Sequence, residues 1–340
     1  MDYQEMLANA RANLGPLCKA CPVCDGRGCK GAIPGPGAKG RGTVAIENYE
    51  AWQRVRVNMD TLHEAGAVDT STTLFGRTFV MPVFAGPVGA VKLHYGDTYD
   101  DAAYNDILVP ACANAGIAAF VGDGTDPTVL RAGAAAVKAA DGVGVPTIKP
   151  WDAETVRRKL VEASASHSFA VAMDVDAAGL PFLVNAQPPA GPKSVDELRK
   201  IISLAGKPFI VKGIMTVAGA QKAVEAGAAA IIVSNHGGRV LDGVPATAEV
   251  LPQIARAVGG SVKVLVDGGI RSGLDVFRAL ALGADGVLVA RPFVTAVYGG
   301  GAEGVKLVAS KLQAELADAM RMCGAASIAD IDAGMIWREG

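Results

Sequence analysis

The sequence predicts an α/β protein, a TIM (β/α)8 barrel with a cysteine-rich N-terminal extension. Eight short apolar runs recur along the chain, and each is followed by a segment with the pattern of a helix. This alternation is typical of a barrel, whereas an open doubly wound sheet has fewer strands and usually a Gly-x-Gly-x-x-Gly motif after the first strand, which we do not find. The 340 residues, half of them apolar, suffice for such a core.

The eight runs contain five or six mostly apolar and β-branched residues, a composition that suits parallel strands buried on both faces. Two spacers carry clear helix signals. TDPTVLRAGAAAVKAA opens with Thr-Asp-Pro, and SVDELRKIISLAG places Ser194 three residues before Glu197 and ends in glycine. The expected strands are Val80–Ala85, Ile117–Val121, Val145–Lys149, Phe169–Asp174, Pro208–Lys212, Ala229–Val233, Val262–Val266 and Asp285–Ala290.

Residues 1–45 form the expected extension and residues 46–340 the expected barrel domain. Four of the six cysteines lie in CKACPVCDGRGC, as Cys18, Cys21, Cys24 and Cys29. Four thiolates this close suit a tetrahedral zinc site or an iron–sulfur cluster, and the alternatives are free thiols or a redox-labile disulfide in a flexible arm. The following GAIPGPGAKGRG is expected to be a loop or an extended segment that covers the barrel.

Composition excludes several classes of protein. The net charge of −2 gives no basic excess for binding nucleic acid. No run of about 20 apolar residues predicts a membrane helix, and the N-terminal residues lack the order of a signal peptide, so we expect a cytoplasmic protein. Cys112 and Cys323 are expected in the core, and His63, His94 and His167 are expected to be structural or at the surface.

Polar residues follow the last four predicted strands, where TIM barrels place their chemistry. DGGIRSG, after the seventh run, is expected to bind phosphate. Its glycines let backbone N–H groups approach an anion, Arg271 adds a bidentate contact, and the next helix adds its N-terminal dipole. The candidate residues after the four runs are Lys212, then Ser234, Asn235, His236, Arg239 and Asp242, then Asp267–Gly273, and finally Arg291.

His236 and Arg239 are predicted to form a catalytic pair. Arginine binds a planar carboxylate in a fixed geometry, and histidine accepts a proton near neutral pH. Lys212, at a strand end, is a suitable cation beside a cofactor that gains negative charge on reduction.

At these residues the sequence resembles the FMN-dependent 2-hydroxy acid oxidase and dehydrogenase family, which includes glycolate oxidase and lactate oxidase. The similarity is densest in PFIVKGI, IIVSNHGGRVLDGVPAT and VDGGIRSGLDVFRALALGADGVLVARP, and a weaker similarity begins near Arg54. The resemblance implies that an L-2-hydroxy acid is oxidised to the 2-oxo acid while FMN takes up two electrons. It also implies a homo-oligomer, and it leaves the electron acceptor open.

The resemblance implies a role for each candidate residue. His236 would be the base, Arg239 would hold the substrate carboxylate, and Asp176 would steady the histidine as in a triad. Lys212 would contact the flavin near N1, with Ser234 beside the ring. The phosphate of FMN would be held by Asp267, Gly268, Gly269, Arg271 and Arg291.

The sequence departs from the family on the substrate side. A family tyrosine near the N-terminus is absent from CPVCDG, and a Gln-Leu-Tyr-like segment is replaced by Thr147, Ile148 and Lys149. Asp174 replaces a Ser or Thr, and the loop after the fourth strand is short. Glycolate or lactate therefore cannot be assumed as the substrate. Lys149 either replaces a lost contact to the carboxylate or flavin or is a surface lysine.

Three rival readings share parts of this pattern. A flavin-dependent isopentenyl diphosphate isomerase shares the phosphate cradle but lacks SNHGGR at the sixth strand. A barrel like that of IMP dehydrogenase needs a cysteine after its sixth strand, and none stands there. A non-enzymatic flavin protein that senses redox state through its cysteines would not need both His236 and Arg239.

Overall fold

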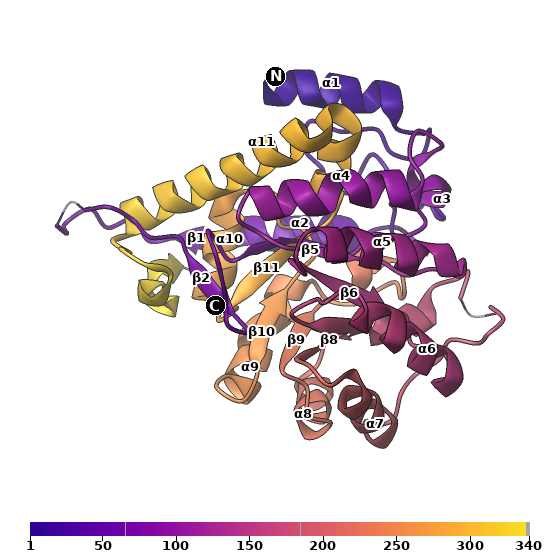
Figure 1. The fold of residues 1–340 in the computed structure, drawn as a ribbon. Coiled ribbons are helices and arrows are strands. Elements are labelled where there is room, and N and C mark those ends of the chain that lie inside the picture. The colour runs from indigo at the N-terminus through magenta and orange to yellow at the C-terminus, as the bar shows by residue number, and fades with distance from the viewer. Residues whose placement is uncertain (65, 184, 338–340) are drawn as a thin grey trace.

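The computed structural model describes residues 1–64, 66–183 and 185–337. Its centre is a closed barrel with the strand order β10-β11-β4-β5-β6-β7-β8-β9, in which every neighbouring pair is parallel (Figure 1). Each of the eight predicted runs overlaps one of these strands, so the predicted TIM barrel is confirmed. The strands are β4 Val83–Ala85, β5 Ala119–Val121, β6 Gly144–Ile148, β7 Val171–Asp174, β8 Phe209–Ile214, β9 Ala230–Val233, β10 Lys263–Val266 and β11 Gly286–Val289.

Helices connect the strands and surround the barrel (Figure 1). The two predicted helix starts are confirmed. Asp126 caps α5 by accepting from the backbone N–H of Thr128, and Ser194 and Glu197 form a capping box on α7. The helices that follow β4, the first strand of the barrel, are α3 Val91–Tyr95, α4 Asp101–Asn114, α5 Pro127–Ala139, α6 Ala153–Ser164, α7 Val195–Ala205, α8 Val217–Glu225, α9 Thr247–Val258, α10 Gly273–Ala281 and α11 Arg291–Cys323.

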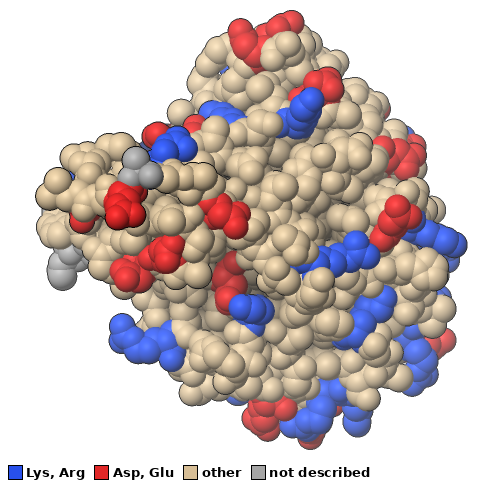
Figure 2. Space-filling model, turned by 60° about the vertical axis from the view of Figure 1, so that its left-hand side comes forward, with Lys and Arg blue, Asp and Glu red and all other residues tan. Residues whose placement is uncertain are grey.

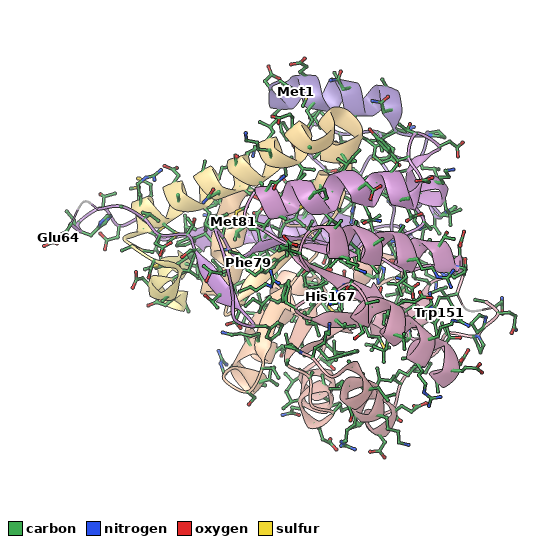
Figure 3. The ribbon with its side chains drawn as sticks, viewed as in Figure 1. Met1, Glu64, Phe79, Met81, Trp151 and His167 are labelled. Atoms are coloured by element: carbon green, nitrogen blue, oxygen red, sulfur yellow. The ribbon has the colours of Figure 1, made fainter. Side chains whose placement is uncertain are left out.

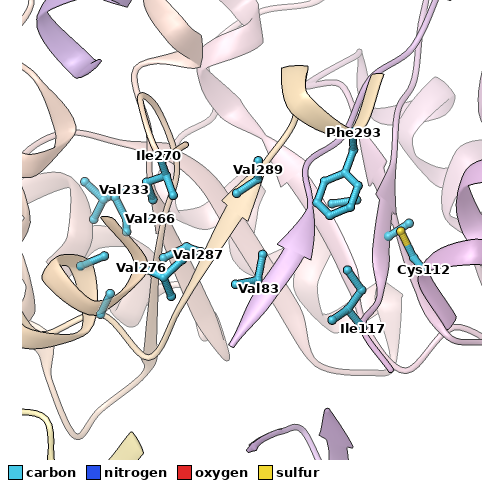
Figure 4. Close-up of a cluster of buried hydrophobic side chains, with 14 of the residues drawn as sticks. Val83, Cys112, Ile117, Val233, Val266, Ile270, Val276, Val287, Val289 and Phe293 are labelled. Carbon is cyan, nitrogen blue, oxygen red and sulfur yellow. The ribbon is translucent and has the colours of Figure 1, made fainter. Parts of the chain in front are cut away.

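Side chains on the two faces of the strands build two cores, because successive residues of a strand point to opposite sides. In β9, Ile232 belongs to the cluster inside the barrel, and Ile231 belongs to the cluster between strands and helices. Figure 4 shows part of the outer cluster, in which Val83 and Val289 lie near Phe293 of α11. The predicted burial of Cys112 and Cys323 is confirmed.

A hairpin of β2 (Thr72–Leu74) and β3 (Arg77–Phe79) packs on the amino-terminal end of the barrel. Phe79 lies edge-on to Phe84 of β4 with ring centroids 5.2 Å apart, and Met81 follows it along the chain (Figure 3). A short ladder joins β1 (Arg56–Val57) to β12 (Ile336–Trp337). The site loops therefore lie at the opposite end of the barrel. Among them are the 3-10 helices η1 Val175–Gly179 and η2 His236–Gly238, while η3 Ile328–Asp330 and η4 Ala333–Met335 lie near the C-terminus.

The N-terminal segment packs on the barrel through two helices. α1 (Tyr3–Asn13) lies along α11 and buries Met6, Leu7 and Ala10 (Figure 1). α2 (Val44–Arg54) buries Asn48 and Trp52 against the site loops. The segment between them has no strand or long helix, and the backbone N–H of Lys39 donates to the carbonyl of Gly238 at 2.8 Å. The predicted covering segment is therefore confirmed.

Charged side chains of both signs are scattered over the face shown in Figure 2, with wide uncharged areas between them. Among the described helices, none is both long enough and apolar enough to cross a membrane.

Candidate active site

A cavity of about 210 Å³ opens at the carboxyl ends of the strands. It brings together residues that lie far apart in the sequence, including the loop after β4 and the start of α3. Lys149 and eight predicted site residues line it; the eight are Lys212, His236, Arg239, Asp267, Gly268, Gly269, Arg271 and Arg291. Asp176 and Ser234 lie just behind the wall, where they contact His236 and Lys212.

His236 is held by Asp176 of η1. Its Nδ1 lies 3.1 Å from Oδ1 of Asp176, so Nδ1–H donates to the carboxylate and Nε2 is left as the acceptor. Burial lowers the pKa of His236, and Asp176 partly opposes this shift. Burial alone would raise the pKa of Asp176, but His236 and Lys212 lower it to about 2. At neutral pH the pair is therefore a neutral imidazole beside a carboxylate.

Lys212, at the end of β8, is a buried cation that also lines the cavity. Its Nζ donates to Oγ of Ser234 at 2.9 Å and lies 3.3 Å from Oδ2 of Asp267. Burial opposes the charge, but the carboxylates of Asp267 and Asp176 outweigh it and raise the pKa of Lys212. Lys212 therefore stays protonated throughout the neutral range.

Helix α2 supports the loops after β9 and β10, a contribution that the sequence did not indicate. The side-chain amides of Asn48 and Asn235 donate to each other at 2.8 and 2.9 Å, and both residues are buried. Trp52 donates from Nε1 to the carbonyl of Gly268 at 2.7 Å. A Cβ on Gly269, which has φ +84°, would lie 2.2 Å from the carbonyl oxygen of Asn48. Only glycine fits this turn.

One expectation about the phosphate loop is wrong. The N–H groups at the start of α10 already donate to carboxylates, from Arg271 and Ser272 to Asp275 and from Gly273 to Glu315. The amino terminus of α10 is therefore not free to bind an anion. Arg271 itself lines the cavity, although its Nε donates to the carbonyl of Cys24 at 2.7 Å.

Arg239 faces the cavity and also anchors the covering segment. Its Nη1 donates to the carbonyls of Gly35 and Gly37, and its Nη2 donates to Pro34 at 3.4 Å. A guanidinium has five N–H groups. The Nε–H and one Nη2–H thus have no partner within the described part of the chain, and together they form an edge that fits a carboxylate.

Lys149 is not a surface lysine. Its side chain is 12% exposed, and Nζ lies 2.6 Å from Oδ2 of Asp174, whose side chain is 2% exposed. Two of the substitutions that set the sequence apart from the resembled family thus form one ion pair at the cavity wall. Ligand atoms of Asp174, Asp176 and His236 lie within 4.8 Å of one another, but Lys149 already neutralises Asp174.

Two further residues in the cavity wall had no predicted site role. Asp123 follows β5 and accepts from Lys159 at 2.6 Å and from Trp151 at 2.7 Å, so reading the residue after the second strand could have found it. His94 is 8% exposed, donates from Nδ1 to the carbonyl of Pro34, and has its pKa lowered to about 4, mainly by burial. His63 and His167 are exposed, as expected.

Two polar atoms of the cavity wall that lack partners fit the ribityl phosphate end of FMN. Among the described residues, Oδ1 of Asp267 and Nη1 of Arg291 are buried without a hydrogen bond. Buried polar atoms are nearly always paired in proteins, and these two belong to residues that line the cavity, so a ligand bound there would pair them. They belong to two of the residues that the sequence predicted as FMN ligands.

The four N-terminal cysteines are free thiols of intermediate exposure. They line a second cavity of about 260 Å³ next to the first. Within the described chain, no three of their sulfur atoms lie within 4.8 Å of one another.

Comparison with known proteins agrees with this site. A family model described as FMN-dependent dehydrogenase matches residues 36–182 and 183–338. A peroxisomal (S)-2-hydroxy-acid oxidase of Oryza sativa subsp. japonica is 32% identical over 323 residues, which cover 86% of this chain and 87% of the relative. An L-lactate oxidase of Nostoc sp. is 48% identical over 141 residues, which cover 42% of this chain and 39% of the relative.

Solved structures show the same similarity over the whole length. Mandelate oxidase superposes with a TM-score of 0.81 at 28% identity and covers 98% of this chain and 97% of its own. Its complex with (S)-2-phenylpropionate gives a TM-score of 0.78 at 29% identity with the same coverage. The barrel, the cavity at its carboxyl end and the family match together show that this chain belongs to the family of FMN-dependent dehydrogenases and is an FMN-dependent oxidoreductase.

Proposed function

We propose that this enzyme oxidises an L-2-hydroxy acid to the corresponding 2-oxo acid. The observation that carries the proposal is the His236–Asp176 pair, which lies in one cavity with the cations Lys212, Arg239 and Arg291. A base, a carboxylate-binding edge and a flavin pocket at one barrel end are what this reaction requires. The names of the rice oxidase and of mandelate oxidase support the same class of substrate.

The flavin would be held along the loops after β8 to β11. Gly268, Gly269, Arg271 and Arg291 would hold the ribityl phosphate, Asp267 would accept from a ribityl hydroxyl, and Ser234 would lie beside the ring. When bound, FMN supplies the acceptor for two electrons. Lys212 would stabilise the negative charge that reduction adds near N1, because its own charge is fixed by Asp267 and Asp176.

His236 would take a proton from the substrate at Nε2. Its lowered pKa keeps the imidazole neutral, and therefore basic, at neutral pH. Asp176 would hold the tautomer with hydrogen on Nδ1 and would stabilise the imidazolium that forms, as the acid of a catalytic triad does.

Arg239 would bind the substrate carboxylate through its Nε–H and the remaining Nη2–H. The three carbonyl acceptors at Pro34, Gly35 and Gly37 fix the plane of the guanidinium. A fixed plane orients the carboxylate, and thus the carbon to be oxidised, without a loss of arginine side-chain entropy on binding.

We infer that the substrate has an apolar side chain. Leu93, Leu180, Phe182 and Leu183 line the cavity away from the phosphate loop. Two buried acids lie at or just behind this wall, and each is paired with a lysine, Asp123 with Lys159 and Asp174 with Lys149. An apolar wall favours an aliphatic or aromatic substituent over a second carboxylate.

The test is anaerobic titration of the FMN-loaded protein with L-2-hydroxy acids of graded side chain, from glycolate and lactate to aliphatic, aromatic and dicarboxylic members. The flavin bands should bleach, fastest with an apolar side chain. Flavin that no acid bleaches would favour the isomerase or non-enzymatic alternatives. Arg271→Ala should bind FMN more weakly, whereas Arg256→Ala on α9, away from the cavity, should not.

Three further expectations remain predictions. The four N-terminal cysteines are proposed to form a metal-containing centre, either zinc or an iron–sulfur cluster. The chain is expected to form a homo-oligomer, which sedimentation would test. We also expect a cytoplasmic protein, although the rice relative is named as peroxisomal.

A further inference from the structure

The second cavity lies between the N-terminal segment and the barrel, and all four cysteines of the N-terminal cluster line it. Cys18, Cys21, Cys24 and Cys29 come from one stretch of turns between α1 and α2. All four are free thiols, and none is fully buried. Twelve consecutive residues thus direct four sulfur ligands at one space of about 260 Å³.

We propose that this cavity binds a four-iron, four-sulfide cubane cluster through the four cysteines. Tetrahedral zinc with Zn–S bonds of about 2.3 Å needs sulfur atoms about 3.8 Å apart. Within the described residues, no three of these sulfurs gather within even 4.8 Å. A cubane holds its four thiolates farther apart, because the iron–sulfide core lies between them. A cavity lined by all four cysteines, with no three of their described sulfur atoms close enough for one zinc ion, therefore favours a cluster over a single zinc ion.

The wall of the cavity that the barrel contributes is cationic. Arg271, Arg291 and Lys311 line it. Nη1 of Arg291 is buried and has no hydrogen-bond partner among the described residues, while Nε of Arg271 donates to the carbonyl of Cys24. A cubane with four thiolate ligands is an anion, so these two arginines would offset its charge in a partly buried site.

The loop between the cysteines is shaped for close approach. A Cβ on Gly28 would lie 2.5 Å from Sγ of Cys21, so glycine alone lets the backbone pass over this sulfur. The backbone at Gly28, just before the fourth cysteine, therefore lies close to the sulfur of the second cysteine, Cys21.

The proposed cluster site shares a wall with the flavin cavity. Pro36, Arg271 and Arg291 line both spaces. We therefore assign the cluster a role in electron transfer from the reduced flavin to an acceptor protein, an assignment that rests on the proposed function. Oxidation of one hydroxy acid yields two electrons and two protons. The cluster carries one electron at a time, so two transfers reduce two molecules of a one-electron acceptor protein, and the protons pass to solvent.

The first experiment measures metal content and does not depend on catalysis. The full-length protein, purified without oxygen and reconstituted with ferrous iron and sulfide, should hold about four iron and four acid-labile sulfide per chain. Reduction with dithionite should give the electron paramagnetic resonance signal of a reduced cubane. About one zinc per chain without sulfide, or no metal after reconstitution, would overturn the proposal.

Variants locate the ligands. Cys21→Ser/Cys24→Ser should lose iron and sulfide, and a retained flavin spectrum would show that the barrel is folded. Cys112→Ala, a buried thiol outside the cavity, is the matched control and should keep the full iron content. Equal loss in both variants, or no loss in the double variant, would exclude the four cysteines as the site.

A second measurement tests the electron transfer separately. When a hydroxy acid that bleaches the flavin is added without oxygen, the cluster-loaded protein of unmodified sequence should develop the electron paramagnetic resonance signal of the reduced cluster. The double variant should still bleach its flavin, because the substrate cavity is unchanged. An iron-loaded cluster that stays oxidised beside reduced flavin would overturn the relay, and a flavin that no acid reduces would instead overturn the proposed function.

Discussion

Nδ1 of His236 lies 3.1 Å from Oδ1 of Asp176, and this contact joins the loop after β9 to the loop after β7. It fixes which imidazole nitrogen carries hydrogen and leaves the other for the substrate. The proposed reaction depends on this pair, and most of the following predictions test it or the contacts that support it.

Asp176→Asn should slow reduction of the flavin by a hydroxy acid on the order of 10²- to 10⁴-fold, because the imidazolium loses its anionic partner. Asp176 raises the pKa of His236 against the effect of burial. Its removal should therefore shift the acidic limb of kcat/KM to lower pH. Pre-steady-state kinetics across pH checks both effects. Asp176→Glu should restore part of the rate, and a slower variant with an unmoved limb would mean that Asp176 is only structural.

The pH profile of the unmodified enzyme should rise from acid towards neutral pH and then level off. Only neutral His236 can accept a proton, and burial lowers its pKa below the usual 6.5. The fraction of active base therefore grows as pH rises through a midpoint below 6.5 and levels off above that midpoint. Measurement of kcat/KM gives this midpoint for the free enzyme. A midpoint above 7 would contradict a neutral, buried base.

Lys149→Met should destabilise the protein by about 3–5 kcal/mol, because it leaves Asp174 buried without its cation. Lys149→Met/Asp174→Asn should recover much of this loss. Urea denaturation at a fixed excess of FMN measures the free energy of unfolding. The exposed pair Lys263–Asp285 is the matched control, and Lys263→Met should cost less than about 1 kcal/mol. Equal costs for the two lysine variants would mean that Lys149 is not engaged as described.

Asn48→Ala should lower stability by about 1–3 kcal/mol, because the buried amide of Asn235 loses two of its hydrogen bonds and the backbone N–H of Thr247 loses its acceptor. It should also weaken FMN binding, since Asn48 packs against the turn at Gly268. Equilibrium dialysis of FMN and urea denaturation check the two effects. Asn58→Ala removes an exposed bond to Gly334 and should change neither measurement. Unchanged FMN binding in Asn48→Ala would mean that Asn48 of α2 does not support the flavin site.

The barrel and half of the site could be predicted because their signals are local. Each strand is a short apolar run, and parallel strands bring the residues that follow them to one end. This rule placed Lys212, His236, Asp267 and Arg291 around one cavity. Applied to the second run as well, it would have found Asp123.

The rest depends on contacts between distant segments. Asn48 meets Asn235 across 187 residues, and Arg239 donates to Gly35 across 204. No periodicity encodes such pairs. The amino terminus of α10 was mistaken for an anion site because Glu315, which accepts from Gly273, lies 42 residues away on α11. His94 was set aside because its role arises only where the covering segment folds over α3.

Anaerobic mixing of the FMN-loaded protein with the acid that bleaches it most rapidly, followed at the flavin band, tests the central claim most directly. His236→Ala should bind FMN normally but reduce it on the order of 10²- to 10⁴-fold more slowly than the unmodified protein, because the base is gone. Reduction at an unchanged rate, with FMN bound in full, would contradict the assignment of His236 and with it the proposed mechanism.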